Sequence, residues 1–455
     1  MSLPSRRDLL AGASASLLAG CGPSRRPNVL LVLLDQLRAA ALSAHGETNI
    51  ATPHMDRLLD EATAFDCAWT ANPVCAPARA SLWTGLLSTT HGVYDNGWRF
   101  DPRHETVAQP LARAGYRTGY IGKWHLYGRS NPGFVPPSHR AGFDHWQAYN
   151  VSHKDRDLQW FEDASSPLRP TPRDAFGPDV QVDQALDFMR SDTGRPWFLV
   201  VSFGPPHPPG NAPLADWSPH LPDGALDRVD PQSLSLRPNV PDWIRSTNEA
   251  FRLADGSPDP GARAYLHGYY ASILAMDDVV GRLVAGVDRV APDTLIVFTS
   301  DHGEQGGSHG LYGKSEPYAE SLEVPLGFRW PGVVPRSRRL EAPVSLLDLA
   351  PTLLDLAGAR PLRRQHGRSL ADVLLGAAPP DDRAVLAEGS VAGRAWHALR
   401  TRRWTYVKRH SPRAASLFDH ATDPWQLADL AGDPSLRGVQ NQLSDQLALA
   451  RAILD

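Results

Sequence analysis

Short continuous apolar runs recur along the chain and predict buried β-strands. They cover residues 28–34, 116–121, 197–203 and 294–298, and three of them consist largely of Val, Leu, Ile and Phe. Apolar runs without polar alternation are typical of strands whose two faces are both covered. Parallel sheets covered by helices have strands of this kind.

Stretches with helical spacing of apolar residues lie between these strands. Strands that alternate with helices predict an α/β fold, in which a large, mostly parallel sheet is sandwiched by helices. The predicted helices cover residues 53–64, 80–84, 106–114, 181–190 and 263–287.

A proline-rich segment interrupts this pattern at residues 205–241, which hold ten prolines. So many turn-forming residues exclude regular elements, and we interpret the segment as an ordered, irregular excursion over the active face. The alternative is a disordered linker. Trp217 and Trp243 favour the ordered form because they offer anchors for packing.

The pattern changes again at about residue 344. A helix over 345–357, a strand pair over 396–407 and 416–420, and an amphipathic helix over 439–453 follow one another. They predict a smaller C-terminal α+β subdomain over 344–455, after a main domain over 27–343.

The first 21 residues have the anatomy of an export signal, with a charged start and a short apolar run. Arg6-Arg7 resembles a twin-arginine signal, and residues 18–21 resemble a lipobox, in which Cys21 would carry lipid. The alternative is a plain cleaved signal with Cys21 incidental. We therefore expect an exported, periplasmic or cell-envelope protein whose membrane contact is a lipid anchor.

Composition narrows the function classes. The 46 Lys and Arg residues nearly balance 50 Asp and Glu residues, which excludes the basic footprint of a nucleic-acid binder. Three cysteines exclude a disulfide scaffold and any Cys-rich zinc or iron–sulfur framework.

Polar side chains follow each of the four predicted strands. Because ligands bind at the carboxyl ends of parallel strands, these side chains define one predicted crevice. Each residue alone is weak evidence, since an Asp after a strand is often a turn residue or a helix cap. The residues are Asp35 and Gln36, Lys123 and His125, His207, and Asp301 and His302.

Two carboxylates, an amide oxygen and an imidazole from Asp35, Gln36, Asp301 and His302 would meet in this crevice. Such a mainly oxygen-donor set suits a hard divalent cation. A cation there would polarise a substrate oxygen and offset the charge of a tetrahedral anion.

A second candidate centre is Cys75, which precedes a short predicted helix and stands near Arg79. Helix amides and an arginine favour an anionic nucleophile and an anionic substrate. The alternative is a buried cysteine that packs as a small apolar side chain.

The segment from Cys75 to Gly85 carries the most specific pattern in the chain. Cys75-x-Pro77-x-Arg79 followed by Thr84-Gly85 resembles the signature of the sulfatase family, a branch of the alkaline phosphatase superfamily, in which the cysteine becomes formylglycine. Other segments also resemble this family, at residues 28–38, 122–125, 300–314, 345–358, 399–407 and 417–430.

The resemblance implies hydrolysis of sulfate esters by a formylglycine made from Cys75, after maturation by a formylglycine-generating enzyme. It implies one calcium ion bound by Asp35, Gln36, Asp301 and His302, with the modified residue 75 as a further ligand. The region 27–343 would be the sulfatase catalytic domain.

The resemblance also implies roles for the remaining polar residues. Arg79 would hold the hydrated aldehyde, and Lys123 and Lys314 would neutralise the sulfate oxygens. His125 would act as base towards the aldehyde hydrate, and His207 would protonate the leaving alcohol. Residues 94–96 resemble a segment near the substrate in choline-sulfatase-like members, which makes Asn96 a candidate substrate contact.

Two positions depart from the commonest family pattern. Gln36 stands where many members have Asp, and His302 stands where many have Asn. This pair resembles phosphonate monoester and phosphodiester hydrolases, so a phosphoryl substrate is the alternative. A third hypothesis is an inactive, surface-tethered binding lipoprotein in which Cys75 stays a thiol. The organic part of the substrate (aryl, sugar or alkyl) and the oligomeric state are not predicted.

Overall fold

The computed structural model describes the chain from residue 26 to residue 454, with gaps. The predicted export signal at residues 1–21, with Cys21, lies outside the described residues. None of the helices that are described combines the length and the apolar character needed to cross a membrane. The described ranges are 26–128, 133–156, 158–161, 169–170, 175–191, 194–209, 217–241, 248–252, 258–259, 261–380, 383–391, 393–410 and 415–454.

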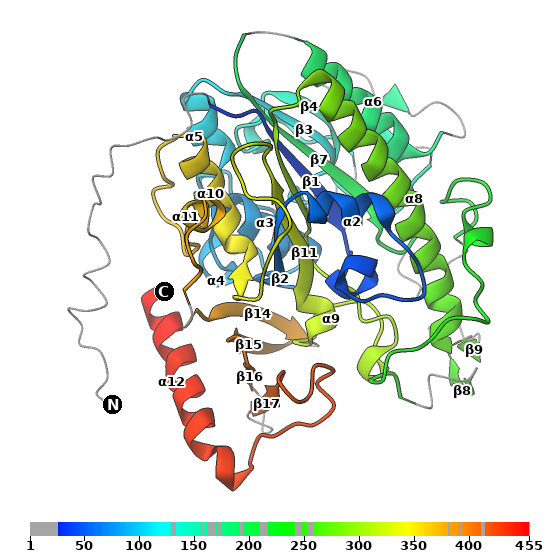
Figure 1. Ribbon diagram of the computed structural model, residues 1–455, viewed down its shortest axis with the longest axis vertical. Helices are drawn as coiled ribbons and strands as arrows, with labels where there is room; N and C mark the ends of the chain where they lie inside the picture. Colours follow the sequence, from blue (N-terminus) through cyan, green and yellow to red (C-terminus); the bar gives the residue numbers. More distant parts are fainter. Residues whose placement is uncertain are drawn as a thin grey trace.

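A large sheet forms the centre of the fold (Figure 1). Its nine described strands are β1 (Val29–Asp35), β2 (Thr63–Trp69), β3 (Arg117–Lys123), β4 (His145–Tyr149), β7 (Trp197–Pro206), β10 (Leu295–Ser300), β11 (Glu323–Arg329), β12 (Arg338–Leu340) and β13 (Val344–Ser345). They lie in the order β12-β2-β11-β10-β1-β7-β3-β4, and β13 pairs with β2. β11 is antiparallel to β10 and β2, and the other pairings are parallel. The predicted mostly parallel sheet is confirmed.

The four predicted strands are β1, β3, β7 and β10, which lie side by side in this sheet. Their carboxyl ends are nearly level: Leu34 of β1 pairs with Ser300 of β10, and Asp35 pairs with Pro206 of β7. The residues that follow these strands therefore reach the same edge of the sheet.

The antiparallel part of the sheet was not predicted. The helix expected over residues 53–64 ends early, as α2 (Pro53–Asp60), because Thr63 already pairs with β11 and β12. Asp66 interrupts the apolar residues of β2, so this strand lacks the continuous apolar run that made the central strands visible.

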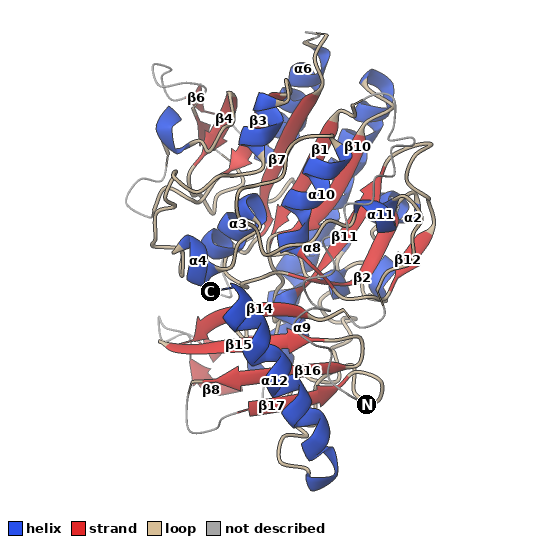
Figure 2. Ribbon diagram, turned by 90° about the vertical axis from the view of Figure 1, so that its left-hand side faces the viewer, coloured by secondary structure: helices blue, strands red, loops and turns tan. Residues whose placement is uncertain are grey.

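Helices cover both faces of the large sheet (Figures 1 and 2). Leu31 and Leu33 of β1 pack in one apolar core with α3 (Cys75–Thr84), α5 (Ala108–Arg113), α10 (Leu349–Leu356) and α11 (Ala371–Leu374). Leu30 and Val32 point to the other face and pack in a second core with α2, α6 (Gly177–Arg190) and α8 (Gly261–Val290). The sandwich predicted from the apolar runs is confirmed.

A second, smaller sheet lies towards the C-terminus. It is antiparallel and holds β14 (Val385–Val391), β15 (Arg394–Arg400), β16 (Trp404–Arg409) and β17 (Ala415–Asp419), and α12 (Arg437–Leu454) packs on it (Figure 2). The strand predicted over 396–407 is in fact the pair β15 and β16, which a turn at Thr401 joins. The division between residues 343 and 344 stays a prediction; α10 and α11 pack on the large sheet.

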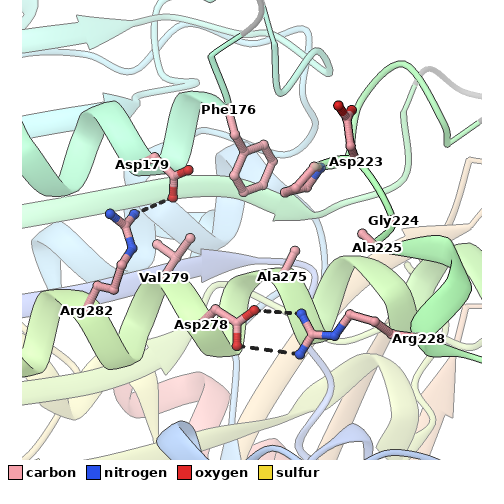
Figure 3. A pocket seen from close by; sticks show the side chains of 11 residues that line it. Phe176, Asp179, Asp223, Gly224, Ala225, Arg228, Ala275, Asp278, Val279 and Arg282 are labelled. Carbon is pink, nitrogen blue, oxygen red and sulfur yellow. Dashed lines mark hydrogen bonds and ion pairs between the residues drawn. The ribbon is translucent and has the colours of Figure 1, made fainter.

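The proline-rich segment is described at residues 205–209 and 217–241. Its first two prolines end β7, so the prediction of no regular element is wrong there. Residues 217–241 pack in the second core through Trp217, Leu221 and Val229. Trp243 lies outside the described residues. Between this segment and helices α6 and α8 lies a surface cavity of about 290 Å³ (Figure 3). Its charged residues pair with one another, Arg228 with Asp278 and Arg282 with Asp179.

The remaining α-helices and strands of the described residues are short. They are α4 (Ser88–His91), α9 (Ala319–Leu322), β5 (Gln159–Trp160) paired with β6 (Arg169–Pro170), and β8 (Asn248–Arg252) paired with β9 (Pro258–Asp259).

Candidate active site

The predicted site residues converge at the carboxyl edge of the large sheet. Asp35 and Lys123 end β1 and β3, and His207 and Asp301 directly follow β7 and β10. Cys75 joins them as the first residue of α3, so it lies in the helix rather than before it as predicted. Ion pairs and hydrogen bonds, described below, connect the strand ends to this helix.

Arg79 fixes the two central carboxylates from one side. Its Nη2 lies 3.0 Å from Oδ2 of Asp35, and its Nε lies 2.9 Å from Oδ2 of Asp301. Its Nη1 donates to the Lys123 carbonyl at 2.7 Å and to the Ser202 hydroxyl at 2.8 Å. These four partners of Arg79 are buried. The guanidinium therefore neutralises the two carboxylates, whose charge would otherwise be costly to bury.

The other carboxylate oxygens face a common centre. Nε2 of His302 lies 3.7 Å from Oδ1 of Asp35 and 3.6 Å from Oδ1 of Asp301, and 3.2 Å from the Cys75 sulfur. The ligand atoms of these four residues all lie within 4.8 Å of one another. They include two carboxylate oxygens, as expected for a divalent-cation site.

The orientation of His302 supports this interpretation. Its Nδ1 lies 2.9 Å from the Gly303 carbonyl oxygen, which can only accept, so Nδ1 carries the hydrogen. In the neutral ring the lone pair is then on Nε2, which faces the carboxylates. Metal-binding histidines are commonly oriented by such a hydrogen bond on the other ring nitrogen.

Gln36 reaches the same centre in a left-handed backbone conformation, with φ of 67°. Its backbone N–H donates to Oδ1 of Asp301 at 3.1 Å. Its side-chain Nε2 donates to Glu304, which leaves Oε1 on the side of Lys314, at 2.5 Å from Nζ. The amide oxygen, the atom that would bind a cation, therefore points inward.

The charges around Cys75 favour a negative group at this position. Lys314 Nζ lies 3.1 Å from the sulfur. Burial opposes ionisation, but Lys314 and Lys123 lower the pKa of the Cys75 thiol well below its usual value. Lys123 Nζ also lies 2.7 Å from Oδ2 of Asp35. Although burial would raise the pKa of Asp35, the cations around it hold that pKa well below its usual range.

The predicted contact Asn96 has a structural partner next to the nucleophile position. Its Oδ1 accepts the Ala76 backbone N–H at 3.0 Å. This amide is one of the N–H groups at the start of α3 that lack a partner within the helix, and Val74, the residue before the helix, provides no side-chain cap. Asn96 therefore acts as a cap supplied from outside the helix; its contact with substrate stays a prediction.

The two candidate acid–base histidines differ in exposure. His125 is buried, and burial lowers its pKa. His207 is half-buried, and burial together with Lys314 and Lys123 lowers its pKa to about 4. Because Lys314 is also half-buried, the opening of the site lies on the side of His207 and Lys314.

Sequence reasoning missed several residues that hold this centre in place. Glu304 accepts from the Gln36 amide and from two backbone N–H groups of the loop that follows it, at 2.8 and 2.7 Å. The backbone carbonyl of Asn150 accepts the His125 backbone N–H at 2.6 Å. Glu304 follows a strand end and was visible in the sequence, but its partners were not.

Comparison with known proteins shows which family the chain belongs to. Residues 27–359 match the family model described as Sulfatase, and residues 307–452 match the model described as N-sulphoglucosamine sulphohydrolase, C-terminal. The chain is 31% identical to the ulvan-active sulfatase of Formosa agariphila, over 93% of this chain and 80% of that protein.

Two solved structures are similar over the same length. YidJ of Bacteroides fragilis has a TM-score of 0.79 and 26% identity over 94% of this chain and 96% of its own. The phosphonate monoester hydrolase of Silicibacter pomeroyi has a TM-score of 0.75 and 25% identity, over the same shares of the two chains. The chain therefore belongs to the sulfatase family, and it is a sulfuric ester hydrolase.

Proposed function

We propose that the chain hydrolyses sulfate esters with a formylglycine made from Cys75 as the nucleophile. The observation that carries this proposal is the position of Cys75. It is fully buried at the start of α3, 3.1 Å from Lys314 Nζ and 3.2 Å from His302 Nε2. A site that favours negative charge at residue 75 suits an ionised oxygen nucleophile as well as a thiolate.

We infer that one divalent cation, calcium, completes the site. The ligands would be Asp35, Gln36, Asp301 and His302, with residue 75 as a further ligand. When bound, the cation supplies positive charge that polarises the sulfate group and favours ionisation of the nucleophile. The inward-facing Oδ1 atoms and the orientation of His302 support this assignment.

The aldehyde at residue 75 would supply, as its hydrate, one hydroxyl as the nucleophile towards sulfur. Deprotonation of the second hydroxyl would break the bond between carbon and the sulfate oxygen, so that sulfate leaves and the aldehyde re-forms. Arg79 would hold the carboxylates of Asp35 and Asp301 in place beside residue 75. Lys123 and Lys314 would bind sulfate oxygens, where their fixed charges act on the charge that develops in the transition state.

Two histidines would move the protons. His125 lies beside Cys75 and would take the proton of the second hydroxyl. His207 would give a proton to the leaving alcohol. The substrate-free site holds His207 neutral at pH 7 because its pKa is lowered to about 4, so the proton must arrive with, or after, the anionic substrate.

A phosphonate monoester or phosphodiester substrate is the second candidate. The combination of Gln36 with His302 and the likeness to a phosphonate monoester hydrolase favour it. Parallel kinetics on 4-nitrophenyl sulfate and on a matching phosphonate monoester and phosphodiester would decide. A higher kcat/KM for either phosphorus ester would make that ester, rather than the sulfate ester, the preferred substrate.

The third candidate, an inactive binding lipoprotein, requires Cys75 to remain a thiol. Mass spectrometry of the peptide that contains residue 75 tests this directly, because conversion to the aldehyde makes the peptide lighter. An unmodified peptide from cells that contain a formylglycine-generating enzyme would contradict the proposed nucleophile. Cys75→Ser in the same cells is the matched control for this shift.

We also propose that the protein is exported and tethered at the cell envelope through lipid on Cys21. The twin-arginine pattern and the lipobox support this proposal. Cys21→Ser should move the protein from the membrane fraction to the soluble envelope fraction. Equal distribution of both forms would leave a plain cleaved signal as the explanation.

A further inference from the structure

A second histidine lies flat against His207. The imidazole rings of His153 and His207 are stacked, with centroids 4.3 Å apart and planes 15° from parallel. His153 is half-buried and lies at the opening of the site together with His207 and Lys314. It belongs to none of the predicted site residues.

The segment that carries His153 is held on both sides. At one end, the Asn150 side chain donates to the Gly128 carbonyl at 2.6 Å and accepts the Tyr127 N–H at 3.0 Å. At the other end, the Arg156 guanidinium donates to the Leu221 carbonyl at 2.8 Å. The backbone carbonyl before Arg156 also accepts an N–H from the start of α6, at 2.7 Å. His153 therefore stands on a fixed support.

A short hydrogen bond sets which nitrogen of His207 carries the hydrogen. Its Nδ1 lies 2.8 Å from the Pro208 carbonyl oxygen, which can only accept, so Nδ1 is the donor and Nε2 is left for proton transfer. A hydrogen bond at one edge of a ring does not by itself fix the tilt of the ring about that edge. The stacked ring of His153 limits this tilt from one face.

Charge supports the same arrangement. The groups that face His153 are Lys123, His207, Cys75 and Lys314. Burial, Lys123, His207 and Lys314 lower the pKa of His153 to about 2, although Cys75 opposes this change. His153 is therefore neutral at pH 7, and its ring does not repel a protonated His207.

We propose that His153 is a positioning residue, whose ring holds the plane of His207 so that Nε2 points at the oxygen of the leaving alcohol. This inference rests on the proposed function. As the bond between sulfur and the ester oxygen breaks, the electron pair goes to that oxygen. The oxygen takes the proton of Nε2, and neutral imidazole remains.

The experiment compares three variants of the formylglycine-containing protein on two aryl sulfates, one with a strongly acidic phenol and one with a weakly acidic phenol. His153→Ala removes the ring, and His153→Phe keeps a flat ring of similar size without nitrogen. His410→Ala is the matched control, because His410 also contacts another histidine, His397, but on the small sheet. Thermal unfolding of each variant shows whether it folds.

The proposal expects His153→Ala to lower kcat on the weakly acidic phenol by about tenfold or more, since misplaced general acids lose part of their roughly 10²–10⁴-fold effect. The loss on the strongly acidic phenol should be smaller, because that leaving group needs less protonation, and KM should change little. His153→Phe should restore kcat to within about threefold of wild type, and His410→Ala should match wild type.

Three results would overturn the proposal. Equal losses on both esters would mean that proton transfer is not affected. A His153→Phe variant as slow as His153→Ala would mean that the imidazole nitrogens act directly. A rise in KM alone would make His153 a substrate contact. If the wild-type protein hydrolyses neither ester, the proposed function is refuted. If the wild-type protein is active and His153→Ala does not change its kcat, only this inference is refuted.

Discussion

Asp155 offers a sharp test of the electrostatics beneath the site. The residue is 3% exposed, and its Oδ2 has no hydrogen-bond partner among the described residues. Burial raises the pKa of the carboxyl from 3.8 to about 8, although Lys123 opposes this rise. The folded protein therefore keeps a proton on Asp155 at neutral pH, which the unfolded chain has lost.

The sign of the effect follows from proton linkage. Between pH 4 and pH 8 the folded state binds about one proton more than the unfolded state at this group, so stability falls as pH rises. The slope is at most about 1.4 kcal/mol per pH unit. Asp155→Asn replaces the protonated carboxyl by a neutral group of the same shape. The difference in unfolding free energy between the variant and wild type should therefore change by about 2–3 kcal/mol, in favour of the variant, as the pH rises from 5 to 7.

Urea unfolding of both proteins at pH 5, 6 and 7 measures this difference. Asp433→Asn is a matched control, because Asp433 is an exposed helix cap bonded to Ser435, which lowers its pKa. Asn is also a good cap, and the pKa of Asp433 lies below 3.8 in the folded state, so the control should show almost no pH dependence relative to wild type between pH 5 and pH 7. A difference between Asp155→Asn and wild type that stays constant from pH 5 to pH 7 would refute the reasoning.

Cys75→Ala should abolish turnover and leave thermal unfolding within a few degrees of wild type; residual kcat near the wild-type value would remove Cys75 from the mechanism. Removal of divalent metal by a chelator should lower both activity and the unfolding temperature, because a cation bound only by the folded state adds stability; restoration by calcium checks the identity, and no response would contradict the metal site. Arg79→Lys keeps the charge, but a lysine cannot bind two carboxylates and two other groups. We expect a loss of about 3–5 kcal/mol in the free energy of unfolding and a large fall in kcat/KM. Near-wild-type values for both would show that the carboxylates do not need the guanidinium. Burial raises the pKa of the Cys67 thiol to about 11, so Cys67 in the native protein should not react rapidly with a disulfide reagent at pH 8. Rapid labelling of the peptide that contains Cys67 would refute its burial.

The sequence predicted the centre of the fold because β1, β7 and β10 are buried on both faces and consist of unbroken apolar runs. The polar residues after these runs, such as Asp35 and Asp301, were visible for the same reason. β2 and β11 were missed because an antiparallel pairing between distant segments determines them, and no periodicity marks that pairing.

The supporting residues of the site could not be predicted. His153 and Asp155 lie in a segment without regular structure, and only the folded chain brings them to β7 and His207. The role of Asn96 as a cap for α3 depends on a contact across 20 residues of sequence. Such partners are set by tertiary packing, so residue type and spacing carry no signal for them.

The complete burial of Cys75 constrains how this enzyme is made. In the folded chain no part of residue 75 is open to a second protein, so under the proposed function the maturing enzyme would have to act before α3 docks against the sheet. The proposed oxidation and the proposed export through a route for folded proteins would then be separated by folding, with oxidation first. A chain that folds first would then keep the thiol, and adding the maturation enzyme afterwards should not rescue activity.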